Sequence, residues 1–245
     1  MDIVMRTGIL WLLLALLPWP PRFSSVPGGQ LDPDRFQAAR ERMVAEQIAA
    51  RDIKDPRVLA AMRQVPRHLF VPVDERESAY DDRPLSIGHG QTISQPYIVA
   101  LMTELARPKP ASRALEIGTG SGYQAAVLSA LVAEVFTIEI VDPLARDART
   151  RLMDLGYKNV VARAGDGYGG WPDKAPFDLI LVTAAPDHVP PALITQLKPG
   201  GRLVIPVGPV LSVQELLVIQ KDASGRTQTQ HIIPVRFVPL RRDSD

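Results

Sequence analysis

The chain has 245 residues, 46% of them hydrophobic and 22% charged, which is the composition of a folded globular protein. Its formal net charge is only +1, and no block of like charge occurs in its interior, so a protein that binds a nucleic-acid backbone is not expected. The lack of cysteine excludes disulfides, cysteine-ligated zinc, iron–sulfur clusters and thiol nucleophiles, and the four scattered histidines predict no metal site.

The first thirty residues differ from the rest of the chain. Arg6 precedes the apolar run ILWLLLALL (residues 9–17), and a proline-rich stretch follows, which resembles a secretory signal peptide or a weak membrane anchor. The run is too short to predict a transmembrane helix, and no small-residue cleavage site follows it. We interpret residues 1–30 as a signal-like or anchor segment; the alternative is that translation begins downstream, for example at Met43.

Residues 31–110 are expected to form an N-terminal helical subdomain that carries an active-site loop. An amphipathic helix is predicted over 34–50, and a second helix over 55–65 begins at an Asp-Pro pair. The sequence PRHLFVP after it is expected to be extended. The polar, glycine-rich segment GHGQTISQP (residues 88–96) then precedes the apolar run YIVALMTELA, so it is either an elaborate helix cap or a binding loop.

From residue 111 to 245 strands and helices alternate. Strands are expected at 113–117 and 135–140 and in NVVARAGD, FDLILVTAA and RLVIPVG, with helices between them. Two further strands, QELLVIQ and HIIPVRFVPL, have only a turn signal at 224–226 between them. The pattern predicts an α/β fold, doubly wound, with a mostly parallel seven-stranded sheet and an antiparallel C-terminal hairpin.

The strongest chemical signal is the glycine turn in LEIGTGSGY (residues 115–123). A buried strand ends in GxGxG at Gly118, Gly120 and Gly122, and a helix begins at once, so the backbone can approach a ligand closely. The dinucleotide fingerprint has the different spacing GxGxxG. The alternative to ligand binding is that the glycines serve only to reverse the direction of the chain.

Three carboxylates follow strand ends near this turn. Glu116 lies just before the first glycine, where negative charge disfavours a pyrophosphate and suits a ligand with positive charge. Glu139 ends the next strand, where it can accept hydrogen bonds from a ribose diol, and Asp166 follows the third, where it can accept one from the amine of adenine. Each acid by itself could be a helix cap or a solvated charge. Together they indicate an adenosine-bearing sulfonium, S-adenosylmethionine.

With these motifs the chain resembles the protein-L-isoaspartate (D-aspartate) O-methyltransferase family. The similarity runs from about Met43 to Leu240 and includes the sequences PLSIGHGQTISQPYIVALMTELA, ALEIGTGSGYQAAVLSALV, RAGDGYGGW, APFDLILVTAAP, QLKPGGRLVIPVG and PVRFVPL. It implies a Rossmann-like methyltransferase fold, S-adenosyl-L-methionine as co-substrate, no metal, and age-damaged proteins containing isoaspartate as partners.

The implied reaction is methyl transfer to the free α-carboxylate of L-isoaspartyl and D-aspartyl residues, which initiates repair through a succinimide. The alternatives are a methyltransferase that acts on another small carboxylate or a phenol, and a protein that binds S-adenosylmethionine without catalysis.

The resemblance places the active-site serine at Ser94 and implies that Gln91 and Thr92 line the cleft. From its position alone, Ser94 could instead cap the helix that follows it. His89 is interpreted as a loop residue, because a carboxylate that is already ionised needs no base. The predicted cofactor-binding residues are Gln91, Thr92, Glu116, Gly118, Thr119, Gly120, Gly122, Glu139, Asp166 and Gly167.

Two features of the chain predict different cellular locations for the protein. The leader favours export or membrane insertion, whereas S-adenosylmethionine is charged and made in the cytoplasm. We expect a cytoplasmic enzyme with weak membrane association through residues 9–17. The alternative is a periplasmic enzyme, if residues 1–25 act as a signal peptide. The sequence leaves the oligomeric state open.

Overall fold

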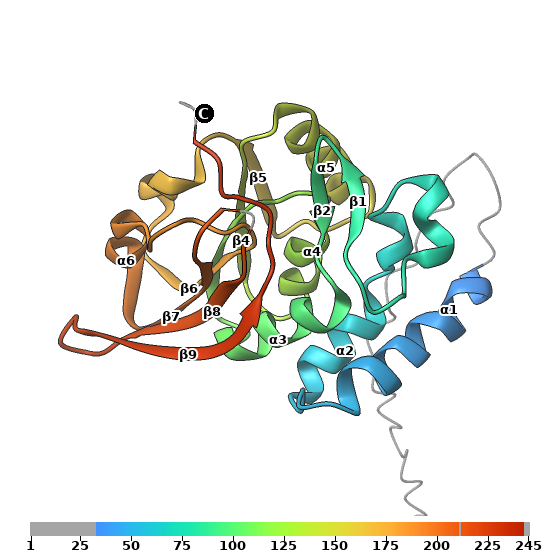
Figure 1. The fold of residues 1–245 in the computed structure, drawn as a ribbon, viewed down its shortest axis with the longest axis horizontal. Helices are drawn as coiled ribbons and strands as arrows, with labels where there is room; N and C mark the ends of the chain where they lie inside the picture. The colour runs from blue at the N-terminus through green and yellow to red at the C-terminus, as the bar shows by residue number, and fades with distance from the viewer. Residues whose placement is uncertain (1–32, 211, 243–245) are drawn as a thin grey trace, which may run out of the picture. The chain divides into compact units, whose positions relative to one another are not determined.

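The central sheet of the protein has seven strands in the order β5-β4-β3-β6-β7-β8-β9 within the part of the chain that the structure describes (Figure 1). This computed structural model describes residues 33–210 and 212–242, so the expected signal-like segment lies outside the described residues. The strands are β3 Arg113–Ile117, β4 Glu134–Glu139, β5 Val160–Ala164, β6 Phe177–Val182, β7 Leu197–Val207, β8 Gln214–Lys221 and β9 Thr227–Val235.

The ladders confirm the predicted mixture of directions. Strands β3 to β7 pair in parallel, whereas β8 pairs antiparallel with both β7 and β9. A tight turn joins β8 to β9, in which Asp222 accepts hydrogen bonds from the backbone N–H groups of Ser224 and Arg226 at 2.8 and 3.0 Å. The turn signal at 224–226 therefore marked a real hairpin.

Helices cover both faces of the sheet because the inner strands are apolar on both faces. Neighbouring residues such as Ala114 and Leu115 point to opposite sides and belong to two separate hydrophobic clusters. The first cluster includes residues of α3 (Pro96–Ala106), α4 (Tyr123–Ser129) and α5 (Asp142–Asp154), and the second includes Leu193 of α6 (Pro191–Gln196). This is the doubly wound arrangement that the strand–helix alternation predicts.

The order of the strands creates a crevice at one end of the sheet. From β3 the chain moves outward through β4 to β5, and then returns to place β6 on the other side of β3. Connections on the two sides of β3 therefore diverge at its carboxyl end. Open α/β sheets bind ligands at such a reversal point.

Two of the expected elements near the N-terminus differ from the prediction. The single helix expected over 34–50 is α1 (Pro33–Arg42) followed directly by the π-helix Met43–Ala49, whose wider turn lets Met43, Val44 and Ile48 all be fully buried. The segment PRHLFVP is not extended, because it contains the 3-10 helix Arg67–Leu69. That turn is anchored by the buried Arg67, whose Nε donates to the carbonyl of Ala79 at 2.7 Å.

The helical region and the sheet share one core. The second predicted helix is α2 (Pro56–Gln64), capped by Asp55, whose carboxylate accepts from the N–H of Arg57 at 2.9 Å. Val58 of this helix belongs to the same hydrophobic cluster as Leu179 and Val204 of the sheet. From Pro33 onward the chain is therefore one compact unit.

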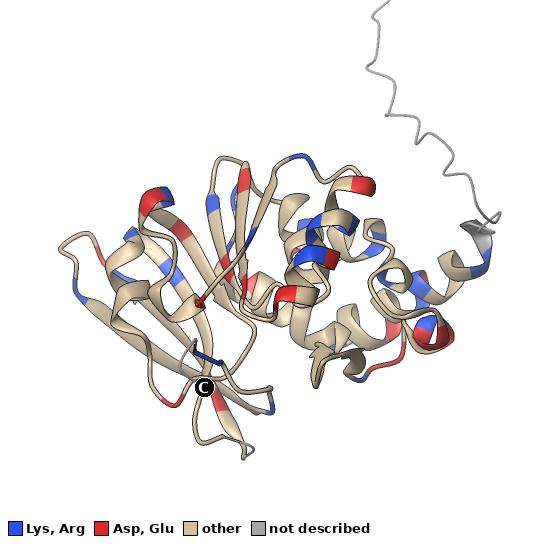
Figure 2. Ribbon diagram, turned by 90° about the horizontal axis from the view of Figure 1, so that it is seen from above, with Lys and Arg blue, Asp and Glu red and all other residues tan. Residues whose placement is uncertain are grey.

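The segment GHGQTISQP forms most of a small hairpin, β1 (Leu85–Gly88) and β2 (Gln91–Ile93), outside the main sheet. Gly88, His89 and Gly90 have positive φ values of 85°, 53° and 70°, which produces its tight turn, with His89 exposed as a loop residue. Basic and acidic residues are interspersed over the elements that Figure 2 shows. In the described ranges no helix has the length and hydropathy needed to cross a membrane.

Candidate active site

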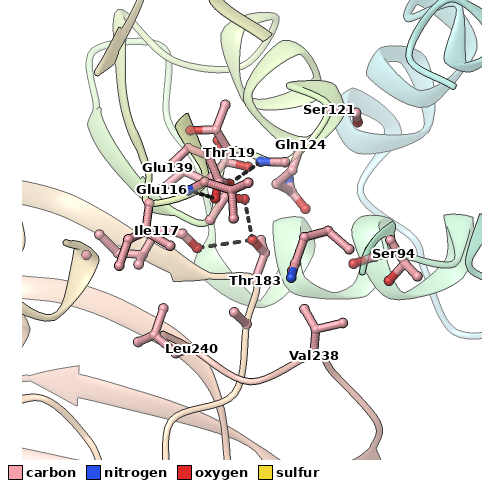
Figure 3. Close-up of a pocket in the computed structure, with 18 of the residues that line it drawn as sticks. Ser94, Glu116, Ile117, Thr119, Ser121, Gln124, Glu139, Thr183, Val238 and Leu240 are labelled. Atoms are coloured by element: carbon pink, nitrogen blue, oxygen red, sulfur yellow. Dashed lines mark hydrogen bonds between the residues drawn. The ribbon is translucent and has the colours of Figure 1, made fainter. Parts of the chain in front are cut away.

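A cavity lies at the carboxyl ends of β3, β4 and β6, at the point where the order of the strands in the sheet reverses (Figure 3). The hairpin β1–β2 and the C-terminal segment also contribute to its lining. The cavity brings together nine of the eleven predicted site residues: Gln91, Thr92, Ser94, Glu116, Gly118, Thr119, Gly120, Glu139 and Gly167. Gly122 and Asp166 are not part of its lining.

The glycine turn needs glycine for different reasons at its two ends. Gly118 has φ +95°, and a Cβ added there would lie 2.6 Å from Thr183 Oγ1. Gly122 has φ +90°, and its added Cβ would meet Leu152 of α5 at 3.2 Å. Gly118 is therefore required where β3 and β6 meet at the cavity, whereas Gly122 is required for packing against a helix.

Glu139 connects the end of β4 to the glycine turn. One carboxylate oxygen accepts from the N–H of Gly120 at 2.7 Å, and the other accepts from the N–H of Val141 at 2.9 Å. A carboxylate oxygen has two lone pairs, so each can accept a further hydrogen bond from the cavity. This geometry holds the carboxylate rigidly and leaves it able to bind a diol.

Glu116 is fully buried in the same wall. One of its oxygens accepts from Thr137 Oγ1 at 2.6 Å, and Oε1 has no partner among the described residues. Burial raises the pKa of Glu116 to about 8; the Thr137 hydrogen bond opposes this shift and the charge of Glu139 adds to it. An unpartnered buried acceptor beside the cavity fits a ligand that carries a positive charge or N–H donors.

Asp166 and Gly167 are adjacent in the chain, but only Gly167 lines the cavity. The Asp166 carboxylate caps the 3-10 helix Gly167–Gly169 by accepting from the N–H of Tyr168 at 2.7 Å. Gly167 lines the cavity and is packed against Ile117, whose Cγ2 would lie 2.3 Å from an added Cβ. A role for Asp166 in binding adenine stays a prediction.

Ser94 does not cap the helix that follows it, so the capping alternative is wrong. The N-cap of α3 is Gln95, and no side chain forms a capping hydrogen bond with the first backbone N–H groups of this helix. The Ser94 hydroxyl forms no hydrogen bond with the other described residues. It is therefore available to a ligand.

A second cavity of about 390 Å³ adjoins the first. Thr92, Ser94, Thr183 and Val238 line both, so Ser94 lies where the two cavities meet. The first cavity has a free volume of only about 60 Å³, whereas small-molecule sites commonly have about 300–1,000 Å³. The cavity is therefore narrow for a ligand of nucleoside size.

The sequence interpretation missed two parts of this site. Thr183, just after β6, donates from Oγ1 to the carbonyl of Gly118 at 2.7 Å and so braces the glycine turn. The C-terminal segment crosses the site because Ala185 exchanges hydrogen bonds with Val238 and Leu240 at 2.8 and 2.9 Å (Figure 3). Polar residues at the end of FDLILVT and the motif PVRFVPL were the available signals. Neither predicts by itself that these segments meet.

The fold and the site define a class of protein. A doubly wound sheet, a GxGxG turn at its reversal point and a carboxylate at the end of the next strand make it an S-adenosylmethionine-dependent methyltransferase with a Rossmann-like fold. The described residues contain no group of three His, Cys, Asp or Glu side chains that could hold a metal ion.

Residues 38–245 match the protein-L-isoaspartate (D-aspartate) O-methyltransferase family, and the chain belongs to this family. The Opitutus terrae protein-L-isoaspartate O-methyltransferase is 62% identical over 204 residues, which are 83% of this chain and 87% of that protein. Protein-L-isoaspartate O-methyltransferase 2 of a Polaromonas species is 61% identical over 186 residues, 76% of this chain and 88% of that protein.

A solved structure from Plasmodium falciparum is similar over almost its whole length. It is described as a beta-aspartate methyltransferase in complex with S-adenosyl-L-homocysteine, and it is 26% identical, with a TM-score of 0.71 over 83% of this chain and 99% of that chain. The recognition of the family from GHGQTISQP and the glycine turn is confirmed.

Proposed function

We propose that this chain, a protein-L-isoaspartate O-methyltransferase, methylates the free α-carboxylate of L-isoaspartyl and D-aspartyl residues at the junction of its two cavities, with Ser94 as the residue that holds the carboxylate. The observation that carries the proposal is that Ser94 lines both cavities and has a free hydroxyl. One cavity has the chemistry of a cofactor site, and the other is open to a substrate.

The first cavity supplies groups for each part of S-adenosylmethionine. Glu139 accepts from the ribose diol with the lone pairs that its backbone bonds leave open. Glu116 would offer its unpartnered Oε1 to the positively charged end of the cofactor. Gln91 and Thr92 close over it from the hairpin, and Gly167 gives space beside the adenine.

The hairpin is the part of the wall best suited to open. Ile87 of β1 lies over the glycine turn, with its Cδ1 3.3 Å from where a Cβ of Gly120 would be. The hairpin pairs only with itself among the described strands, so displacing it breaks no ladder of the main sheet. It therefore acts as a lid over the cofactor.

For methyl transfer the protein mainly has to align the carboxylate oxygen with the methyl group and the sulfur of the cofactor. Bound S-adenosylmethionine supplies a methyl group on a sulfonium, which is a good leaving group. The substrate carboxylate is ionised at neutral pH and needs no general base. Ser94 donates a hydrogen bond to one carboxylate oxygen and so points the other toward the first cavity. The methyl ester that results loses methanol when the neighbouring amide nitrogen attacks it. This closes a succinimide, which hydrolyses partly to normal aspartate.

A labelling experiment tests this function. The purified protein is incubated with cofactor labelled in its methyl group and with paired peptides that differ only in isoaspartate or aspartate. We expect label in the isoaspartyl peptide alone. Equal labelling of both peptides, or labelling of small carboxylates or phenols instead, would contradict the proposal. Cofactor binding without any labelling would indicate a binding protein.

The cytoplasm is the proposed location of the enzyme. Its support is the charged cofactor, which does not cross a bilayer unaided. A reporter that is active only after export, fused behind residue 40, tests this. An inactive reporter is expected; strong reporter activity would favour the periplasmic alternative.

A further inference from the structure

The second cavity has one charged residue, Arg236, among the described residues of a lining that is otherwise apolar or uncharged. Its polar lining residues Thr92, Ser94, Gln95 and Thr183 are uncharged, and Arg236 is the single charged residue among the described residues that line it. The rest of the lining consists of Pro84, Ile98, Val213, Pro234, Val235, Phe237 and Val238. A substrate segment in this cavity therefore meets one positive charge and no negative charge from the described lining.

The backbone on both sides of Arg236 is held in place. Phe237 donates from its N–H to Gln214 Oε1 at 2.9 Å, and the carbonyl of Val238 accepts from the N–H of Ala185 at 2.8 Å. Val235 before it pairs with Gln214 in the β8–β9 ladder. The Arg236 side chain itself is exposed and forms no hydrogen bond or ion pair with other described residues. The backbone therefore keeps Arg236 beside the cavity, and no described residue neutralises its charge.

We infer that Arg236 determines the charge preference of the enzyme: it favours isoaspartyl sites with acidic neighbouring residues and disfavours those with basic ones. The inference rests on the proposed function, because it assumes that the residues flanking the isoaspartate occupy the second cavity. The carboxylate being methylated is held at Ser94, so Arg236 acts on neighbouring side chains and sets affinity, not the chemical step.

The expected effect is modest because Arg236 is exposed to solvent. An exposed ion pair is worth little, and replacing attraction with repulsion doubles the difference, so acidic and basic peptides should differ by about 2- to 30-fold in kcat/KM. The difference should lie in KM and should shrink as salt screens the charges.

Three peptides test the inference. They share one isoaspartyl residue and carry Glu, Gln or Lys at the positions on both sides of it. Each is assayed at low and high salt with the wild-type chain, Arg236→Gln and Arg236→Glu. Arg226→Gln is the control, because Arg226 is an exposed arginine just before the strand that Arg236 follows, roughly 30 Å away for a strand of this length, and its ion pair is with Asp222 of the turn. Melting temperatures check that every variant is folded.

We expect the wild type and Arg226→Gln to prefer the Glu peptide, Arg236→Gln to lose the preference and Arg236→Glu to reverse it. The same ratio of Glu to Lys peptide in the wild type and in Arg236→Glu would overturn the inference while leaving the proposed function intact. If the wild type methylates none of the three peptides, the proposed function fails and the inference fails with it.

Discussion

Two glutamates on adjacent strands of this site have different surroundings, and the difference assigns them different tasks. Both oxygens of Glu139 accept backbone N–H groups of the cavity wall, which fixes the carboxylate in place. Glu116 has one hydroxyl partner and one free oxygen in a fully buried position, which raises its pKa to about 8. Their positions along the chain predicted different partners for the two acids, and the structure adds which of their oxygens are already hydrogen-bonded.

At the scale of single residues, Ser94→Ala should lower kcat strongly while leaving cofactor affinity and stability nearly unchanged. Loss of one positioned donor to a reacting oxygen costs roughly 2.7–4 kcal/mol in oxyanion sites, and less is expected here because the carboxylate loses charge as it reacts. Ser94 caps no helix, so the ~1 kcal/mol loss of a cap is not expected. Steady-state kinetics, calorimetry and thermal melts measure the three quantities.

The control for this variant is Ser86→Ala, because Ser86 is an exposed serine on β1 of the hairpin that precedes Ser94. It should leave turnover unchanged. If Ser94→Ala lowers only the melting temperature and turnover holds, Ser94 has a structural role and the proposed clamp is wrong.

The cofactor-free protein should become more stable with Glu116→Gln, by an amount that grows with pH. In the unfolded chain Glu116 loses its proton near the ordinary glutamate pKa of 4.5, whereas the folded group keeps it until about 8, so the wild type loses stability between these values. The gain should be small at pH 5 and reach at least about 1 kcal/mol at pH 8, the free energy of one pKa unit.

Urea denaturation at several pH values measures this gain, and Glu46→Gln on the exposed side of the π-helix is the control. A gain for Glu116→Gln that stays constant from pH 5 to pH 8 would mean that Glu116 is ionised throughout this range. The same variant should bind the proposed cofactor more weakly, because the positive charge of the cofactor lowers the pKa of Glu116 and so favours an ionised carboxylate, which glutamine cannot supply.

At the scale of elements, the site is assembled from short connections. The glycine turn after β3 is braced from one side by Glu139, the last residue of β4, and from the other by Thr183 after β6. The hairpin β1–β2 covers it through Ile87, and the C-terminal segment is tied in at Ala185. These connections extend from a sheet that is buried on both faces, and the packed sheet holds their ends at fixed positions.

Gly118→Ala should therefore reduce cofactor affinity severely and destabilise the protein. The added methyl group would lie 2.6 Å from Thr183 Oγ1, and alanine at φ +95° is strained by more than about 1 kcal/mol. Calorimetry with S-adenosylhomocysteine and denaturant unfolding measure the two losses.

Gly156→Ala separates backbone strain from the steric clash. Gly156 has φ +81° and nothing within 4 Å of an added Cβ, so this variant should lose stability but keep full cofactor affinity. If Gly118→Ala bound S-adenosylhomocysteine as tightly as the wild type, the glycine turn would not be part of the cofactor site.

At the scale of the whole molecule, the helical region and the sheet form one hydrophobic cluster from Met43 of the π-helix to Val235 of β9. Neither part can unfold without exposing apolar surface of the other. The predicted division into residues 31–110 and 111–245 follows the change from helices to alternating strands and helices along the chain. In the structure the described residues of these two regions share one core.

Thermal unfolding should accordingly show a single transition, and S-adenosylhomocysteine should shift all of it. Ligand at 100 times its Kd adds ≈2.7 kcal/mol, which for a chain of this size raises Tm by roughly 5–11 °C. Differential scanning calorimetry with and without ligand measures this. Two separate transitions, of which the ligand moves only one, would show that the two regions unfold independently.

Much of this protein could be predicted from local patterns. Alternating strands and helices predicted the α/β sheet, SGR predicted the terminal hairpin, and the strand-GxGxG-helix sequence predicted the ligand-binding turn. These signals work because each depends on neighbours within a few residues, such as the positive φ that only glycine adopts easily. The same local rules failed for PRHLFVP, where a buried arginine twelve residues from its acceptor holds a 3-10 turn.

Local sequence patterns were enough to predict the fold class, the family and nine of the residues that line the first cavity. The tertiary structure alone decided which polar groups are already satisfied: Asp166 caps a turn, Ser94 caps nothing, and Glu116 has one oxygen without a partner. It alone also brought Thr183 and the segment around Val238 to the glycine turn. The physical reason is that hydrogen-bond satisfaction and burial depend on groups far apart in the chain, which sequence spacing does not report.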